Sequence, residues 1–152
     1  HRGLAAARRG SGDPGAMMRI SAIEFLGVNV TPKTNWCFLL VRTEDGRTGL
    51  GECTLMNQEA LLAAEAARLA ATLAGEDALA RNRIARLIPH APGGLVAHAA
   101  TSALEQALWD LAGQASGQPI HALLGGALRP AVPLYANINR GAEPRTPEGF
   151  AA

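Results

Sequence analysis

The chain contains few side chains of the kinds that carry out proton transfer or hold metal ions. It has a single lysine, Lys33, and four histidines, which are His1, His90, His98 and His121. No two histidines have the His-x-x-x-His spacing of a metal site, and none has a carboxylate at a spacing that would orient it. The thirteen acidic residues are dispersed along the sequence. We therefore predict no catalytic residue and no metal ligand in this chain.

Three strands are predicted ahead of any helix. Apolar and polar residues alternate over 19–30, residues 36–41 are apolar on both faces, and residues 48–53 form a strand that contains glycines. The phrase at 44–47, Glu-Asp-Gly-Arg, is a strong hairpin signal. The pattern predicts a three-stranded antiparallel meander, with the proline-containing loop 31–35 projecting from the sheet.

Helical periodicity follows the strands. Apolar residues three and four positions apart predict two helices, with Asn57 and Asp77 as candidate N-caps. A third helix is predicted over residues 96–116, and Gly117 and Pro119 end it. Together these patterns indicate an α+β domain in which the meander is followed by a helical bundle.

The last segment of the sequence predicts two further elements. Residues 132–137 are typical of a short buried strand, and Thr146-Pro147-Glu148 is typical of a helix start with Thr146 as N-cap. Few residues remain after it, whereas roughly 12 to 15 residues are marginal for an isolated helix. We therefore expect that the sequence stops inside an element and is truncated.

Composition and charge exclude several classes of partner. Fourteen basic and thirteen acidic residues leave a formal net charge of +1, which gives no electrostatic case for binding nucleic acid or a membrane surface. No apolar run approaches the roughly 18 to 20 residues that cross a bilayer. Residues 1–16 are rich in Arg, Ala and Gly, and we expect a disordered leader or tag remnant. Without a secretory signal, a cytoplasmic protein is expected.

The two cysteines, Cys37 and Cys53, fall on the two arms of the predicted second hairpin. A two-residue turn at Asp45-Gly46 would place Cys37 opposite Thr54, so that the two sulfurs lie on opposite faces of the sheet. One residue of bulge would reverse this arrangement. We predict reduced thiols, because nothing in the sequence indicates secretion.

Three phrases occur in a fixed order along the chain: NWCFLLVRTEDGRTGLGE, then SALEQALWDLAGQASGQPIHALLGG, then PLYAN. In this order they resemble the mandelate racemase and muconate lactonizing enzyme family of the enolase superfamily. The resemblance covers the N-terminal capping domain and the first barrel strand. GLGE alone is a weak signal, whereas ALWDLAG followed by a G-x-P, LLGG and a strand with tyrosine is specific. Gln106 departs from the pattern, because relatives usually carry an apolar residue there.

The resemblance implies an enolase-like capping domain over residues 17–126 and the start of a truncated TIM-type barrel over residues 127–152. The barrel of such enzymes removes a proton next to a carboxylate and stabilises the enediolate on Mg²⁺. Its metal ligands lie at the ends of later barrel strands, and its Lys-x-Lys base needs two lysines. The resemblance therefore implies Mg²⁺ in the full-length enzyme, with none bound by this chain.

In this family the capping domain supplies loops that cover the barrel mouth and select the substrate. The corresponding segments here are residues 31–35 and 54–57. The substrate-binding residues that the resemblance implies are Lys33, Thr34, Asn57, Asn137, Asn139 and Arg140. The last three would lie at the carboxyl end of the first barrel strand, which is the catalytic face. Ordinary exposed loop residues remain the alternative.

Two functions from different classes remain open. The first is the substrate-capping part of a Mg²⁺-dependent lyase or isomerase, with the polar loops favouring an acid-sugar dehydratase over a racemase or cycloisomerase. Its partners would be a small carboxylate or acid sugar and the C-terminal barrel domain, and the chain alone would be inactive. The second is a self-standing, non-catalytic module that binds a partner where a barrel would dock. A homo-oligomer is also left open.

Overall fold

The computed structural model describes residues 17–88, 94–135 and 146–151, so the expected leader lies outside the described residues. Strands β1 (Ile20–Thr31), β2 (Thr34–Thr43) and β3 (Thr48–Glu52) form an antiparallel sheet in the order β1-β2-β3. The helices are α1 (Glu59–Leu73), α2 (Arg81–Leu87), α3 (Gly94–Ser116), α4 (Ile120–Leu123) and α5 (Pro147–Ala151). The predicted meander followed by helices is confirmed.

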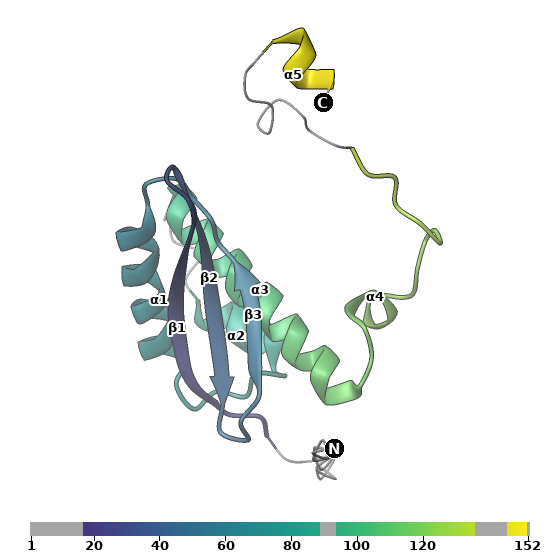
Figure 1. Cartoon of the computed structure of the whole chain (residues 1–152). Coiled ribbons are helices and arrows are strands. Elements are labelled where there is room, and N and C mark those ends of the chain that lie inside the picture. Colours follow the sequence, from purple (N-terminus) through teal and green to yellow (C-terminus); the bar gives the residue numbers. More distant parts are fainter. Residues whose placement is uncertain (1–16, 89–93, 136–145, 152) are drawn as a thin grey trace, which may run out of the picture.

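Helices α1 and α3 pack on one face of the sheet, and none of the described helices covers the other face (Figure 1). Strand β2 buries alternate residues against α1 and α3, namely Cys37, Leu39 and Val41. The buried face of α3 consists mainly of Ala100, Ala103, Leu104, Ala107, Leu108 and Leu111. Within the described residues, no helix combines the length and apolar composition that a bilayer span requires.

Helix α3 lies directly on the backbone of β3. A Cβ atom added at Gly51 would lie 1.8 Å from the carbonyl oxygen of Ala103, and one added at Gly49 would lie 2.2 Å from that of Ala107. Both distances are far shorter than a van der Waals contact. Glycine on the strand and alanine on the helix therefore permit an approach that any larger residue on the strand would block.

Polar side chains of α3 bond to the free edge of β3. Asp110 Oδ2 accepts a hydrogen bond from the Leu50 N–H at 3.0 Å. Gln114 Nε2 donates to the Thr48 carbonyl at 2.8 Å. Four helix residues rise about 6 Å and two strand residues about 6.7 Å, so one side chain per helical turn can meet every second strand residue.

Gln106 completes this row of side chains. Its Oε1 accepts from the Glu52 N–H at 3.1 Å, and its Nε2 lies 3.3 Å from the Glu52 carbonyl oxygen. An open strand edge presents unpaired backbone groups to other chains, and a polar side chain at this position occupies them. The Gln106 side chain, which departs from the pattern of the family, therefore bonds both backbone groups of Glu52 at the end of β3.

The first hairpin is tighter than the sequence indicated. Thr31 pairs with Thr34, so only Pro32 and Lys33 form the turn. The predicted loop over residues 31–35 was too long. The polar residues on either side continue the ladder because the proline, which has no N–H to donate, falls within the turn itself.

The turn of the second hairpin is one residue longer than predicted, and Gly46 within it has a φ of 86°. The extra residue shifts the register, so that the Cys53 N–H donates to the Cys37 carbonyl at 2.8 Å. The prediction that the two sulfurs lie on opposite faces is therefore wrong. Both are free thiols buried in the core between sheet and helices.

Both predicted helix caps at Asn57 and Asp77 are wrong. Helix α1 begins at Glu59, and Asn57 adopts a positive φ of 59° in the loop before it. The Asp77 carboxylate accepts hydrogen bonds from the N–H groups of Met18 at 3.2 Å and Leu79 at 3.1 Å. Each residue stabilises a loop instead of a helix start. Asn and Asp are common in both places.

Residues 124–135, which follow α4, are exposed along their whole length. Residues 131–135 form no strand, and Leu134 and Tyr135 are 94% and 85% exposed. The strand predicted over residues 132–137 is therefore not formed in its described part, because a strand needs a partner for its backbone groups. The predicted cap of α5 is confirmed, since Thr146 Oγ1 accepts from the Gly149 N–H at 3.2 Å.

Replacing Gly51 with alanine should destabilise the domain strongly. The new methyl group would enter the α3 backbone, and overpacking of this kind costs about 1–3 kcal/mol. Urea unfolding followed by circular dichroism measures the loss. Gly27→Ala is the matched control, because a Cβ there meets only the Phe25 ring at 3.5 Å. Equal stability of the two variants would contradict the close packing of α3 on β3.

The two thiols should react slowly in the folded chain. Burial raises the pKa of Cys53 to about 11 and also raises the pKa of Cys37, so little of the nucleophilic thiolate is present near neutral pH. We expect labelling by a thiol-specific disulfide reagent to be slow without denaturant and rapid in urea. Rapid labelling of both cysteines in the native chain would show that this part of the core is open.

Candidate functional site

Three of the predicted substrate-binding residues lie together at one end of the sheet. The β1–β2 turn and the loop between β3 and α1 enclose a hollow of about 460 Å³. Lys33, Thr34 and Asn57 line it, together with Asn29, Pro32, Asn35, Trp36, Thr54, Met56 and Glu59. Residues of the two segments that the sequence pointed to therefore line one hollow.

The other three predicted residues, Asn137, Asn139 and Arg140, lie outside the described residues. Their part in the site stays a prediction. The described site consists of the hairpin tip, the loop before α1 and the first residue of α1.

A chain of hydrogen bonds joins the hairpin tip to the start of α1. Asn29 Nδ2 donates to Asn35 Oδ1 at 2.9 Å, and Asn35 Nδ2 donates to Glu59 Oε1 at 2.8 Å. Asn29 Nδ2 also donates to the Thr31 carbonyl at 2.9 Å. These bonds hold the tip in one position relative to the helix.

Glu59 is ionised at neutral pH. The hydrogen bond from Asn35 is the main reason that the pKa of Glu59 lies below its ordinary value, and a bond from its own backbone N–H acts in the same direction. As the first residue of α1, it also lies where the helix dipole favours a negative charge. The wall of the hollow therefore carries a carboxylate, while Lys33 at the turn carries a positive charge.

The loop between β3 and α1, which forms the second wall, is held by one hydrogen bond to β2 and by the conformation of Asn57. Thr54 Oγ1 accepts a hydrogen bond from the Cys37 N–H at 3.0 Å, which ties the loop after β3 to β2. Asn57 then takes a left-handed conformation at φ 59°, which asparagine tolerates better than most residues. This conformation lets the chain turn from the loop into α1. Asn57 itself is exposed beside the hollow.

The sequence did not single out Asn29 or Glu59. Asn29 lay within a predicted strand, and Glu59 lay in the first turn of the helix that Asn57 was expected to cap. Asparagine is depleted from strands, and its presence in a predicted strand could have drawn attention to Asn29.

The groups that line the hollow are of the kinds that bind a small polar anion. An ammonium group can pair with a carboxylate, and amide, hydroxyl and carboxylate groups can bond hydroxyls. Across the described ranges, no group of three or more His, Cys, Asp or Glu is arranged to hold a metal ion.

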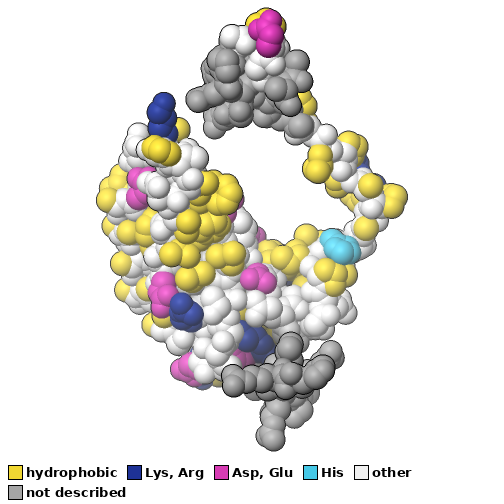
Figure 2. Space-filling view, in the orientation of Figure 1, with side chains coloured by type: hydrophobic (Ala, Val, Ile, Leu, Met, Phe, Trp, Pro, Cys, Tyr) yellow, Lys and Arg dark blue, Asp and Glu magenta, His cyan; other side chains and the backbone are white. Residues whose placement is uncertain are grey.

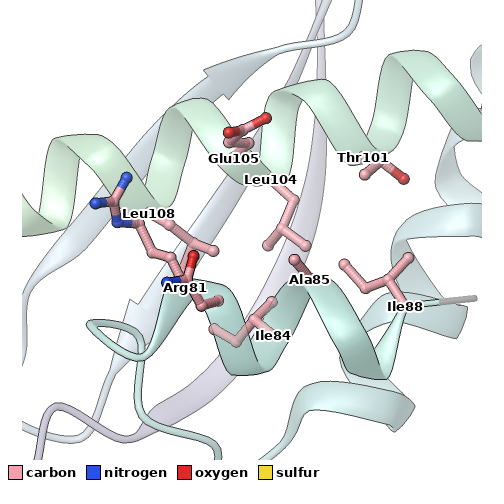
Figure 3. A pocket seen from close by; sticks show the side chains of 9 residues that line it. Arg81, Ile84, Ala85, Ile88, Thr101, Leu104, Glu105 and Leu108 are labelled. Carbon is pink, nitrogen blue, oxygen red and sulfur yellow. The ribbon is translucent and has the colours of Figure 1, made fainter. Parts of the chain in front are cut away.

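A second hollow of about 210 Å³ lies between α2 and α3 (Figure 3). Ile84, Leu104 and Leu108 form its apolar floor, and none of the predicted site residues lines it. The Arg81 guanidinium at its rim stacks 3.3 Å from the centroid of the Trp109 ring. Because the indole holds this cation and no predicted site residue lines the hollow, we do not assign it as the site.

Comparison with known proteins identifies the domain. The family model described as "Mandelate racemase / muconate lactonizing enzyme, N-terminal domain" matches residues 20–125. This range runs from the first residue of β1 to the turn after α4 and includes the hollow at the hairpin tip.

Individual relatives agree with the family match. A D-mannonate dehydratase from Caulobacter vibrioides is 36% identical over 112 residues, which cover 71% of this chain and 28% of the dehydratase. The crystal structure of a muconate cycloisomerase from Pseudomonas fluorescens superposes with a TM-score of 0.72 at 27% identity, covering 83% of this chain and 37% of that one. The crystal structure of a mandelate racemase/muconate lactonizing protein from Paracoccus denitrificans, complexed with magnesium, superposes with a TM-score of 0.60 at 31% identity. The match covers 74% of this chain and 31% of that one.

The chain thus spans 28% of the length of the curated relative. The three-stranded meander, the helices packed on one face and the matched range 20–125 all agree. This chain belongs to the mandelate racemase and muconate lactonizing enzyme family of the enolase superfamily, as its N-terminal domain.

Proposed function

We propose that this chain is the substrate-capping part of a Mg²⁺-dependent acid-sugar dehydratase that removes the proton next to a carboxylate. The observation that carries the proposal is the hollow at the hairpin tip, where Lys33, Thr34 and Asn57 converge with an ionised Glu59. The similarity to a D-mannonate dehydratase supports the substrate class.

In this proposal the residues of the hollow bind and orient the substrate. Lys33 attracts the negative charge of an acid sugar, while Thr34 and Asn57 bond its hydroxyls and Glu59 accepts from one of them. The hairpin tip, lying over the bound substrate, excludes water, which strengthens each of these interactions. A substrate with several hydroxyls suits a wall made of amides and a carboxylate better than an apolar acid does.

The chemical step belongs to residues that the described part of this chain does not provide. We infer that a C-terminal barrel domain supplies the base and the metal ligands, and Mg²⁺ there would stabilise the negative charge of the enediolate. The magnesium complex of the relative from Paracoccus denitrificans supports this assignment. The two free, buried thiols favour a reducing compartment such as the cytoplasm.

Lys33→Met in the full-length enzyme should weaken the use of acid sugars. Removing the cation should raise KM at least tenfold with a smaller change in kcat, because one charge-assisted contact contributes about 1.5–3 kcal/mol. The 2-keto-3-deoxy acid released by dehydration of D-mannonate or D-galactonate is measured in the presence of Mg²⁺.

The matched control is Arg68→Met on α1, whose guanidinium bonds Glu65 away from the hollow. It should leave KM unchanged. The 152-residue chain alone should release no keto acid. Turnover by the chain alone, or an unchanged KM in Lys33→Met, would contradict the proposal.

Asn35→Ala should return the pKa of Glu59 toward its ordinary value, because Asn35 provides the main hydrogen bond to the carboxylate. A carboxyl pKa that is depressed by folding stabilises the chain above the unfolded pKa, and this stabilisation is lost as pH falls through the folded pKa. Wild type should therefore lose more stability than Asn35→Ala on acidification to about pH 3.

Carbon-detected NMR titration of the glutamate carboxyls measures the pKa directly. Glu65 serves as the internal reference, since its pKa is lowered mainly by Arg68 and should not move in the variant. A Glu59 titration that is unaltered in Asn35→Ala would show that the amide does not hold the carboxylate.

A further inference from the structure

The hollow at the hairpin tip carries its two opposite charges on different walls. Of the described residues that line it, only Lys33 is a cation and only Glu59 is an anion. Lys33 is exposed on the β1–β2 turn, whereas Glu59 is partly buried at the start of α1. The ion pairs among the described residues do not join these two side chains. The hollow is therefore positive on one wall and negative on another.

The carboxylate of Glu59 is fixed in position and in charge. Asn35 Nδ2 donates to Glu59 Oε1 at 2.8 Å, and Asn29 Nδ2 in turn donates to Asn35 Oδ1 at 2.9 Å. The hydrogen bond from Asn35 also favours the charged form and keeps the pKa of Glu59 below its ordinary value. A ligand that enters the hollow thus meets an ionised group that is tied to the neighbouring hairpin.

An ionised carboxylate only accepts hydrogen bonds. Its two oxygens offer about four acceptor sites. Asn35 and the backbone N–H of Glu59 itself occupy some of these sites, and the others can accept from a ligand hydroxyl. A second ionised carboxylate has no hydrogen to donate, and its charge is repelled. Glu59 therefore favours a hydroxyl and disfavours a carboxylate on its side of the hollow.

The surroundings do not offset this repulsion. The other described residues that line the hollow are uncharged, so Lys33 is the cation available to an anionic ligand. The adjoining outer face of the sheet is apolar, with Leu26, Val28 and Trp36 exposed (Figure 2). The ligand that matches this charge pattern has an anionic group at one end and hydroxyls at the other.

We propose that Glu59 selects acid sugars that carry a single carboxylate, with their hydroxyl end at the start of α1 and their carboxylate end toward Lys33. This inference rests on the proposed function, in which an acid sugar occupies the hollow. A sugar acid with a carboxylate at each end would place one of them against Glu59 whichever way round it bound. Specificity of this kind depends on repelling the wrong ligand as well as on bonding the right one.

Two matched pairs of acid sugars test the proposal with the full-length enzyme. They are D-galactonate with galactarate and D-mannonate with mannarate. The members of each pair differ only at the far carbon, which carries a hydroxyl in the monocarboxylate and a carboxylate in the dicarboxylate. Release of the keto acid in the presence of Mg²⁺ gives kcat/KM for each. We expect wild type to prefer the monocarboxylate by roughly a hundredfold or more, because a site built to bond a hydroxyl rejects a ligand without one.

Glu59→Gln tests the carboxylate directly. The glutamine oxygen can still accept from Asn35, and its NH₂ group can donate to a ligand carboxylate, so the repulsion is removed while the hydrogen bond to the hairpin is kept. The ratio of kcat/KM for the monocarboxylate to that for the dicarboxylate should fall at least about tenfold, because a like-charge contact is lost. This ratio does not change if some of the enzyme is unfolded, since both acids are measured with the same preparation.

Two further variants check the arrangement. Glu65→Gln is the matched control, because it removes a carboxylate of α1 that bonds Arg68 and does not line the hollow. It should leave the ratio unchanged. Lys33→Met should lower kcat/KM for both acids of a pair by a similar factor, because Lys33 meets the carboxylate end that they share.

An unchanged ratio in Glu59→Gln, or wild type that uses both acids of a pair equally well, would overturn the role of Glu59 and leave the proposed function standing. A ratio that rises in Lys33→Met would overturn the orientation, because it would show that Lys33 binds the far carboxylate of the dicarboxylate. If the full-length enzyme turned over no acid sugar at all, the proposed function itself would be wrong, and this inference with it.

Discussion

The contact between α3 and β3 is the constraint on which the rest of the domain depends. Because Gly49 and Gly51 carry no side chain, the helix carbonyls of Ala103 and Ala107 lie directly on the strand. At this short distance the polar side chains of the same helix reach around the strand edge and bond to it. A larger residue in place of Gly49 or Gly51 would push the two elements apart and weaken both the packing and the edge bonds.

This arrangement also places the candidate site. With β3 held on α3, the loop after β3 has a fixed origin, and the bond from the Cys37 N–H to Thr54 keeps it beside β2. The first hairpin is fixed separately, through Asn35 and Glu59. The two walls of the hollow therefore depend on two different helices, and the sheet between them keeps their spacing constant.

The sequence predicted the order of elements well, because alternation in the strands and the stripe of α3 are strong periodic signals. It also predicted that the loops carrying Lys33, Thr34 and Asn57 belong together, although only through the family resemblance. The prediction was wrong where a single residue sets the strand register. The turn at Gly46 is one residue longer than expected, and this places Cys37 opposite Cys53. The predictions of Asn57 and Asp77 as helix caps were wrong because the same side chains are common in loops and at helix caps.

The turn of the first hairpin consists of only Pro32 and Lys33, with a paired ladder on both sides and a bond to α1 close behind. A hairpin built in this way has its shape before any ligand arrives, so in the proposed function binding would cost little conformational entropy. Its two turn residues make no contribution to the core. Ligand preference could thus drift during evolution by exchanges at the turn, while the scaffold beneath keeps its stability.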